Sequence, residues 1–106
     1  MIIVTTDFVT GYELETVYLV KGSCIQTVHA GKDFFNSLKT LVGGELTSYT
    51  KMMDDSRKIA TERMIAEAEK LRADAVIGVR YTTSNIMQNA AECTVYGTAV
   101  KFKKQV

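Results

Sequence analysis

The feature that most constrains the fold is a long apolar stripe in the middle of the chain. Its members lie three, four or seven residues apart: Leu46, Tyr49, Met53, Ala60, Met64, Ala68 and Leu71. This spacing is close to 3.6 residues per turn and predicts one long helix over residues 45–72, with an apolar side that packs on another layer. The chain has 106 residues, which fits a single domain over 1–106.

A second apolar row runs beside the first one. It is formed by Met52, Ile59, Ala66 and Ala73, each seven residues from the next. Together the two rows cover nearly half of the helix circumference, which is wide for a helix that meets one sheet only. Two interpretations follow: the second row contacts a neighbouring subunit, or it borders a broad core face.

Four segments have the composition of β-strands. They span residues 2–5, 12–29, 75–81 and 92–102 and are rich in β-branched or alternating apolar side chains. Gly22 interrupts the second segment, which predicts a bulge or a bend at that point. We expect the polar stretch 82–89 to join the last two strands as a hairpin loop.

Between the second strand and the long helix, the apolar period changes. Phe34, Phe35, Leu38, Leu41 and Val42 recur at three- and four-residue steps, which predicts a short helix over residues 32–41. Gly43 and Gly44 follow it and suit a helix C-terminus. The resulting order, β-β-α-α-β-β, predicts an α+β fold with helices on one face of a largely antiparallel sheet.

Charge and cysteine content exclude several classes of protein. Thirteen basic and twelve acidic residues leave a net charge of +1, which gives no electrostatic reason to expect nucleic acid or an acidic membrane as partner. The N-terminus lacks the basic start and apolar run of a signal peptide, and no stretch is apolar enough to span a membrane. Two cysteines form no disulfide framework. We therefore expect a cytoplasmic, reducing location.

Soft metal ligands are few. Apart from methionines, they are Cys24, His29 and Cys93. A closed zinc site takes four ligands, commonly in closely spaced pairs, and no such pair occurs here. Cys24 and His29 are five residues apart, so they point to opposite faces of a regular strand. The cysteines are therefore either buried structural residues or ligands that need donors from another subunit, and His29 is either a ligand or an ordinary surface histidine.

The sequence shows no arrangement that favours catalysis. A nucleophile needs a neighbouring base and a group that orients the base, and one histidine without a recognisable triad does not supply them. Asp54 and Asp55 point about 100° apart on a helix, so they do not form a carboxylate pair. We therefore expect a protein that is not an enzyme.

Four segments, taken in order, resemble the YbjQ family. They are Asp33-Phe34-Phe35 running to Val42-Gly43-Gly44, Tyr49, Ala73-Asp74-Ala75-Val76-Ile77-Gly78, and Gly97-Thr98-Ala99-Val100. The family is named for heavy-metal binding and has no established reaction. One departure is Arg72, which stands where members of the family usually carry glycine, so the tight turn after the long helix must be formed differently.

The resemblance implies a dodecin-like fold: a curved antiparallel sheet packed by one long helix and one short helix. It also implies a homo-oligomer, a cyclic pentamer, that binds a divalent or soft heavy-metal ion or another small ligand at subunit boundaries. A module that recruits another protein is the alternative in a different class. A small-molecule enzyme with an inter-subunit cleft is a third.

The matching segments also supply candidate ligand-binding residues: Gly43, Gly44, Tyr49 and Asp74. The two glycines precede the long helix, where free N–H groups can hold an anion, although turn formation also explains them. The carboxylate of Asp74 can serve a ligand, or it can accept backbone N–H groups and fix the turn from helix to strand.

Overall fold

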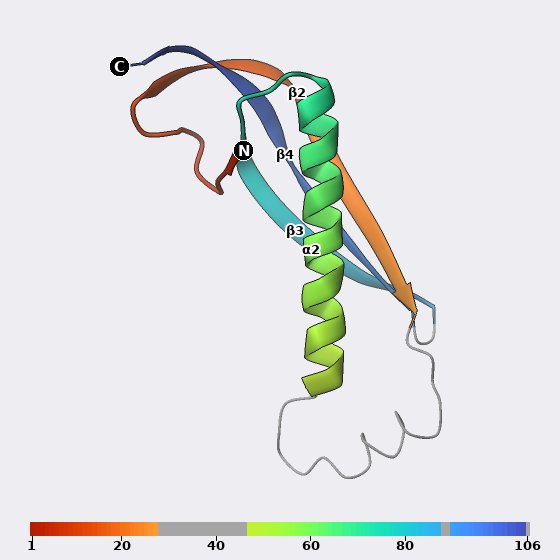
Figure 1. The fold of residues 1–106 in the computed structure, drawn as a ribbon. Helices are drawn as coiled ribbons and strands as arrows, with labels where there is room; N and C mark the ends of the chain where they lie inside the picture. The colour runs from red at the N-terminus through yellow and green to blue at the C-terminus, as the bar shows by residue number, and fades with distance from the viewer. Residues whose placement is uncertain (28–46, 88–89, 106) are drawn as a thin grey trace.

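A four-stranded sheet carries one long helix on one face (Figure 1). The computed structural model describes residues 1–27, 47–87 and 90–105. In chain order, the elements are β1 (Ile2–Ile3), β2 (Tyr12–Thr27), α2 (Thr47–Lys70), β3 (Ala75–Met87) and β4 (Ala90–Gln105). The α+β class and the long helix are thus confirmed, whereas the short helix predicted over 32–41 lies outside the described residues.

The sheet is mixed rather than wholly antiparallel. Its strand order is β1-β3-β4-β2, and β4 runs antiparallel to both of its long neighbours. The short β1 runs parallel to the start of β3, with Ile2 opposite Ala75. A parallel pair needs a long connection, and here β2 and α2 provide it. Figure 1 shows the long strands bending as they pass behind the helix.

The hairpin between β3 and β4 is longer than predicted. Residues expected in a loop continue β3, and Thr82 pairs with Thr94 while Asn85 pairs with Ala91. The loop prediction for these residues was wrong because polar side chains occur in exposed strands as well as in loops. Threonine is polar but β-branched, so it suits a strand whose side chains face water.

Gly22 forms no bulge, which was one of the two alternatives that the sequence predicted. It pairs with Val95 in continuous register, and the irregularities of β2 lie earlier, between Glu13 and Leu14 and between Thr16 and Tyr18. A Cβ atom on Gly22 would collide with backbone atoms of α2, the oxygen of Ala60 and the nitrogen of Met64. The glycine is therefore the point where the helix lies directly on the sheet.

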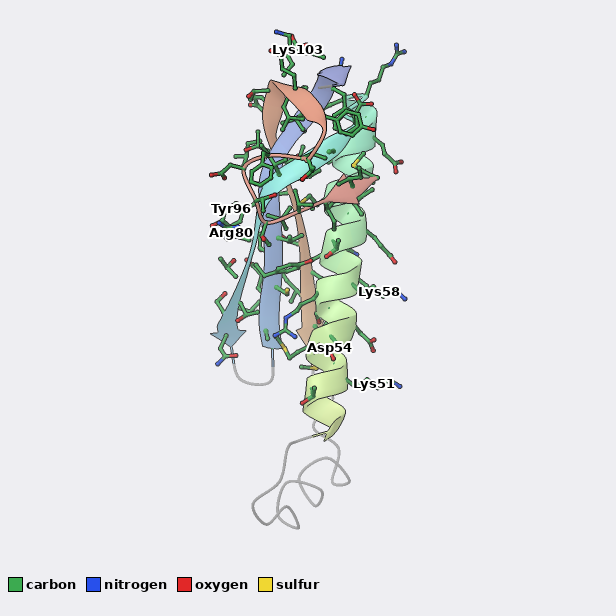
Figure 2. The ribbon with its side chains drawn as sticks, turned by 90° about the vertical axis from the view of Figure 1, so that its left-hand side faces the viewer. Lys51, Asp54, Lys58, Arg80, Tyr96 and Lys103 are labelled. Atoms are coloured by element: carbon green, nitrogen blue, oxygen red, sulfur yellow. The ribbon has the colours of Figure 1, made fainter. Side chains whose placement is uncertain are left out.

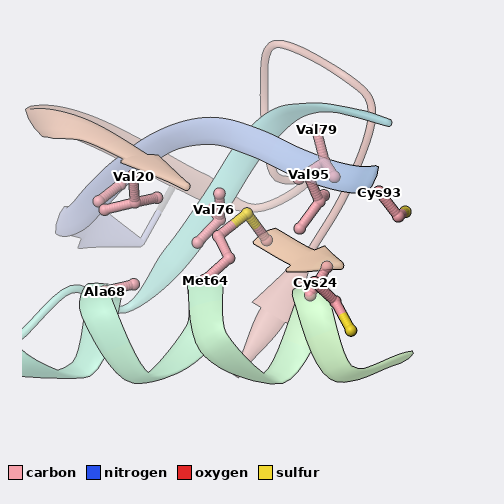
Figure 3. Packing of buried hydrophobic residues seen from close by; sticks show 10 residues of the cluster. Val20, Cys24, Met64, Ala68, Val76, Val79, Cys93 and Val95 are labelled. Atoms are coloured by element: carbon pink, nitrogen blue, oxygen red, sulfur yellow. The ribbon is translucent and has the colours of Figure 1, made fainter. Parts of the chain in front are cut away.

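The core lies between α2 and the three long strands (Figure 3). The predicted stripe is confirmed, because Met53, Ala60, Met64 and Ala68 are buried and Leu71 is partly buried. The side chains of Leu46 and Tyr49 lie outside the described residues. The core cluster consists of Val20, Cys24, Ala60, Met64, Ala68, Val76, Val79, Cys93, Val95 and Ala99.

The second apolar row of α2 borders this core. Ile59 and Ala73 are partly buried and pack against the core cluster, and Met52 is half-buried. Ala66 is exposed. For Ile59 and Ala73, the interpretation as the margin of a broad core face is therefore confirmed.

Arg72 ends the helix region in a conformation that glycine usually adopts. Its φ angle is 58°. The N–H of Arg72 donates to the carbonyl of Glu69 at 2.9 Å, and the N–H of Ala73 donates to the carbonyl of Ala68 at 3.1 Å. These two bonds form the Schellman arrangement of a helix C-terminus. The turn is thus the one that a glycine would form, with arginine in the left-handed region.

Residues after β1 cover the outer edge of the first part of β3. The N–H of Gly78 donates to the carbonyl of Thr6 at 2.9 Å, and the N–H of Val79 donates to that of Val4 at 3.0 Å. Gly78 has a φ of 61°, and the register of β3 against β4 shifts here. Arg80, labelled in Figure 2, adds a hydrogen bond to the carbonyl of Thr5 at 3.0 Å.

Among the described residues, no helix combines the length and the apolar character needed to cross a bilayer.

Candidate metal-binding site

Two cysteines from distant parts of the sequence are direct neighbours in the sheet. In the register of β2 against β4, Cys24 pairs with Cys93. Paired Cα atoms on antiparallel strands lie about 4.5–5.5 Å apart, and their side chains leave the same face of the sheet. Here that face is the one under α2, because Cys24 and Cys93 both belong to the core cluster. We call this pair the dithiol.

The dithiol is shielded from water. Cys24 is 5% exposed and Cys93 is fully buried, and both thiols are free. The side-chain amide of Gln26 donates a weak hydrogen bond to the sulfur of Cys24, at 3.8 Å from Nε2 to Sγ. Arg57 lies near enough to Cys93 to act on its charge. Its guanidinium also pairs with Asp54, at 3.0 Å between Nη1 and Oδ1.

The electrostatic surroundings keep Cys93 in its thiol form. Burial raises the pKa of Cys93, Arg57 opposes this shift through its positive charge, and Cys24 adds to it. The thiolate is the form that attacks electrophiles and binds metals. Cys93 is therefore a poor nucleophile near neutral pH, and a metal ion that binds it has to displace a proton.

The two sulfur atoms of the dithiol point in different directions (Figure 3). Each cysteine has a single side-chain rotation, χ1, with three staggered positions. Because the two strands hold the backbones side by side, binding of one ion by both sulfurs would require rotation about χ1.

The number of donors limits which metals fit. Among the residues with a described structure, no group of three or more His, Cys, Asp or Glu side chains gathers in one place. His29, the third predicted ligand, lies outside them. The described part of the chain therefore offers two thiols rather than the four donors of a closed zinc site.

Two grooves flank the dithiol region on either side of α2. The larger one, of about 390 Å³, lies between the helix and β2 and is lined by Gln26, Asp55, Lys58, Ile59 and Glu62. The smaller one, of about 210 Å³, lies between the first turns of the helix and β3 and is lined by Met53, Thr83, Ser84, Asn85 and Ala91. Gln26 joins the larger groove to Cys24.

Asp74 lies away from the dithiol, at the turn between α2 and β3. Its carboxylate accepts a hydrogen bond from the backbone N–H of Phe102, at 2.8 Å to Oδ2. Its own N–H donates to the carbonyl of Val100, also at 2.8 Å. Asp74 thus fastens the start of β3 to β4, which is the structural role that its position predicted.

The remaining predicted ligand residues are not brought to the dithiol by the described structure. Gly43 and Gly44 lie outside the described residues. Tyr49 belongs to the first turn of α2, at the opposite end of the helix from Asp74, and its side chain is not described. Their roles as ligands stay predictions.

Gln26 and Arg57 were missed as neighbours of the cysteines. A signal was available for Gln26, because residues 24 and 26 of a strand share one face. Arg57 gave no such signal, since its distance from Cys93 depends on where the helix lies over the sheet.

Comparisons with known proteins agree with the resemblance seen in the sequence. Residues 1–103 match the YbjQ family model, described as "Putative heavy-metal-binding". The chain is 63% identical to a UPF0145 protein of Clostridium novyi (strain NT), over 95% of this chain and 98% of that protein. It is 58% identical to a UPF0145 protein of Alkaliphilus metalliredigens, over 96% and 99%.

A solved structure shares the fold. It is the crystal structure of a protein of unknown function from the DUF74 family of Pediococcus pentosaceus, with a TM-score of 0.63 and 19% identity. The likeness covers 97% of this chain and 98% of that one. The match to the family model and the identity to curated relatives both extend over nearly the whole sequence, so this chain belongs to the YbjQ family of UPF0145 proteins.

Proposed function

We propose that this protein binds a soft heavy-metal ion at the dithiol and acts as an assembly of identical subunits. The observation that carries the metal-binding part is the pairing of Cys24 with Cys93 across β2 and β4, with both thiols free and buried. The description of the family as heavy-metal-binding agrees with it.

The chemistry of the dithiol favours soft ions. Thiolates select soft ions such as Cu(I), whereas hard ions such as Mg²⁺ prefer oxygen ligands. Two sulfurs suffice for ions that accept two-coordinate thiolate binding, such as Hg(II), Ag(I) and Cu(I). Each thiol releases its proton to solvent as its sulfur–metal bond forms, so binding strengthens as the pH rises.

Metal titration tests this part of the proposal. We expect one Hg(II) or Ag(I) ion per chain, detected by calorimetry and by sulfur-to-metal charge-transfer absorption. Cys24→Ala and Cys93→Ala should each abolish the two-sulfur absorption, because one thiol remains in either variant. Alanine is used because a buried serine hydroxyl can lack a hydrogen-bond partner. Circular dichroism checks that both variants fold.

The contrary result is equally clear. If the double variant Cys24→Ala, Cys93→Ala binds Hg(II) as tightly as the natural chain does, the dithiol is not the site. Zinc serves as the comparison ion. Tight zinc binding by the monomer would contradict a two-donor site, because structural zinc takes four ligands.

Assembly is supported by the edges of the sheet. β2 is an outer strand, with β4 on one side only in the described sheet. On the opposite side, the contacts of residues 2–6 with β3 extend as far as Arg80 within the described part of the chain. Bare edges invite pairing with another chain. Two different edges on one subunit favour head-to-tail contact, which closes into a ring when the rotation permits it. The pentamer expected from the resemblance is such a ring.

Exposed apolar side chains lie along the same strands. On β2, Tyr18 is 68% exposed and Leu19 and Ile25 are each 58% exposed. On β3, Tyr81 and Ile86 are also exposed. These residues are suited to an interface because their contacts within the subunit are few.

Light scattering on the natural chain tests assembly. We expect a stable oligomer at tens of micromolar, and we expect Tyr18→Lys with Ile25→Lys to shift it toward monomer without unfolding it. Tyr96→Lys is the matched control, because Tyr96 is exposed on the inner strand β4. A monomer for the natural chain, or equal loss of assembly in the control, would overturn the edge-to-edge arrangement.

A further inference from the structure

We propose that the larger groove, between α2 and β2, is the entrance through which a metal ion reaches the dithiol, and that Gln26 is its gate. This inference rests on the metal-binding function proposed above. It goes further by naming the route, the order of binding and the residue that controls access.

Gln26 connects the groove with the dithiol. It follows Cys24 by two residues on β2, so the two side chains share one face of the strand. The amide of Gln26 contacts the sulfur of Cys24 at 3.8 Å, and the same side chain lines the groove. Gln26 is itself half-buried. It therefore stands between solvent in the groove and the sulfur.

The burial of the two thiols gives the direction of entry. Cys24 keeps 5% of its surface exposed, whereas Cys93 keeps none. On β2 just before Cys24, the backbone of α2 lies directly against Gly22, which closes that side. A metal ion thus meets Cys24 first and Cys93 second.

The charges of the groove favour cations. Asp55 and Glu62 contribute two carboxylates, and Lys58 contributes one positive charge between them. The lining is therefore negative by one unit, which raises the local concentration of cations at low ionic strength and is screened by salt. The groove also runs beside the bare edge of β2, so in an assembly that pairs this edge it opens near a subunit boundary.

Alkylation of the metal-free protein tests the gate. Neutral iodoacetamide forms a carbon–sulfur bond at a cysteine, iodide leaves, and the thiol proton passes to solvent. Peptide mapping by mass spectrometry reports the rate at each cysteine. We expect Gln26→Ala to raise the rate at Cys24 about tenfold by exposing its sulfur, and to leave Cys93 slow.

Two further variants distinguish shielding of the Cys24 sulfur by the Gln26 side chain from a general effect of substitution on β2. Gln26→Leu keeps a side chain of similar size and should leave Cys24 almost as protected as in the natural chain. Lys21→Ala truncates an exposed side chain of β2 that points to the opposite face, and should change neither rate. If Gln26→Ala leaves the rate at Cys24 unchanged, or if Lys21→Ala raises it equally, Gln26 is not the gate.

A cationic reagent tests whether the negative charge of the groove lining attracts cations to Cys24. In the variant Asp55→Asn, Glu62→Gln, the methylmercury cation should react with Cys24 about half as fast at low salt, while the iodoacetamide rate stays the same. Glu67→Gln, Glu69→Gln removes two carboxylates of α2 outside the groove and is the matched control. Equal slowing in the control would assign the effect to net charge and overturn the groove as the route.

These rates also separate the two proposals. If the gate behaves as expected but no variant or natural chain retains a soft metal in titration, the metal-binding function is wrong and the route is only an access path to Cys24. If the metal binds at the dithiol but Gln26 has no effect on either rate, the function stands and the gate is wrong.

Discussion

The two halves of α2 meet the sheet in different ways. In the C-terminal half, the small residues Ala60 and Ala68 lie in the core, and the helix backbone touches Gly22. Toward its N-terminal end, the helix has a groove on each side, and the larger groove extends past the middle of the helix to Glu62. Close packing of small residues leaves no space for a ligand. The candidate site therefore lies where the packing is looser.

β3 shows the same contrast along its length. Its first part is buried, with Ala75, Val76 and Val79 in the core. Residues 82–86 are all exposed, although they pair with β4 as regularly as the first part does. Backbone pairing alone thus continues the strand after the helix has stopped covering it. Substitutions in the tightly packed half and in the open half should therefore differ in their effects.

The largest effect is expected for Gly22→Ala. The added Cβ would collide with backbone atoms of Ala60 and Met64, which cannot rotate away as a side chain can. We expect the free energy of unfolding to fall by about 3 kcal/mol, the upper part of the range for overpacked cores. Urea denaturation measures it. Thr83→Ala, in the open half, should change stability by less than about 0.5 kcal/mol, and a similar loss at both positions would contradict the comparison.

Arg72→Gly should stabilise the packed half. Arginine in the left-handed region costs about 1 kcal/mol relative to glycine, because its Cβ crowds the following carbonyl. We expect the free energy of unfolding to rise by somewhat less, since glycine also has more freedom when unfolded. Thermal denaturation measures the gain. Ala66→Gly, at an exposed position inside α2, is the control and should destabilise by about 1 kcal/mol. A loss of stability in Arg72→Gly would show that its side chain makes an essential contact.

The smallest effect concerns the pH dependence of the open half. Burial raises the pKa of Cys93 above its unfolded value, so the unfolded chain loses this proton at a lower pH than the folded chain does. The Cys93 thiol makes its full contribution to the free energy of unfolding below its unfolded pKa of about 8.5. This contribution is lost as the pH rises through the pKa of the folded chain. We expect Cys93→Ala to flatten the decline of unfolding free energy above about pH 8.5. Equal slopes for both chains, measured by urea denaturation at several pH values, would refute this.

Some residues followed from the sequence pattern and others did not. Met53 and Met64 were predictable core residues because they lie on the periodic stripe. Ser56 lies in the same stripe and is 1% exposed, but a pattern of apolar residues does not predict that a serine is buried. Its hydroxyl donates to the carbonyl of Met52 at 3.0 Å, so burial leaves no hydrogen-bond group unpaired. A local side-chain bond of this kind is invisible to a pattern of apolar residues.

The dithiol shows the same limit for the candidate site. Both cysteines were candidates from their chemistry alone, and the family followed from segments in order along the chain. Their pairing could not be predicted, because it depends on the register of β2 against β4, which shifts once by an extra residue on β4 and once by an extra residue on β2. A change of one residue in register would place one thiol on the opposite face.

The sequence by itself determined the long helix, its core stripe, the approximate strands and the family. These rest on local periodicity and on short segments, which are readable residue by residue. The tertiary structure alone decided that β1 runs parallel to β3 and that the backbone of α2 lies against Gly22. It also decided that Cys24 pairs with Cys93 and that the side chain of Gln26 contacts the sulfur of Cys24. Each of these depends on how distant segments lie against one another, which is fixed by packing and strand register together.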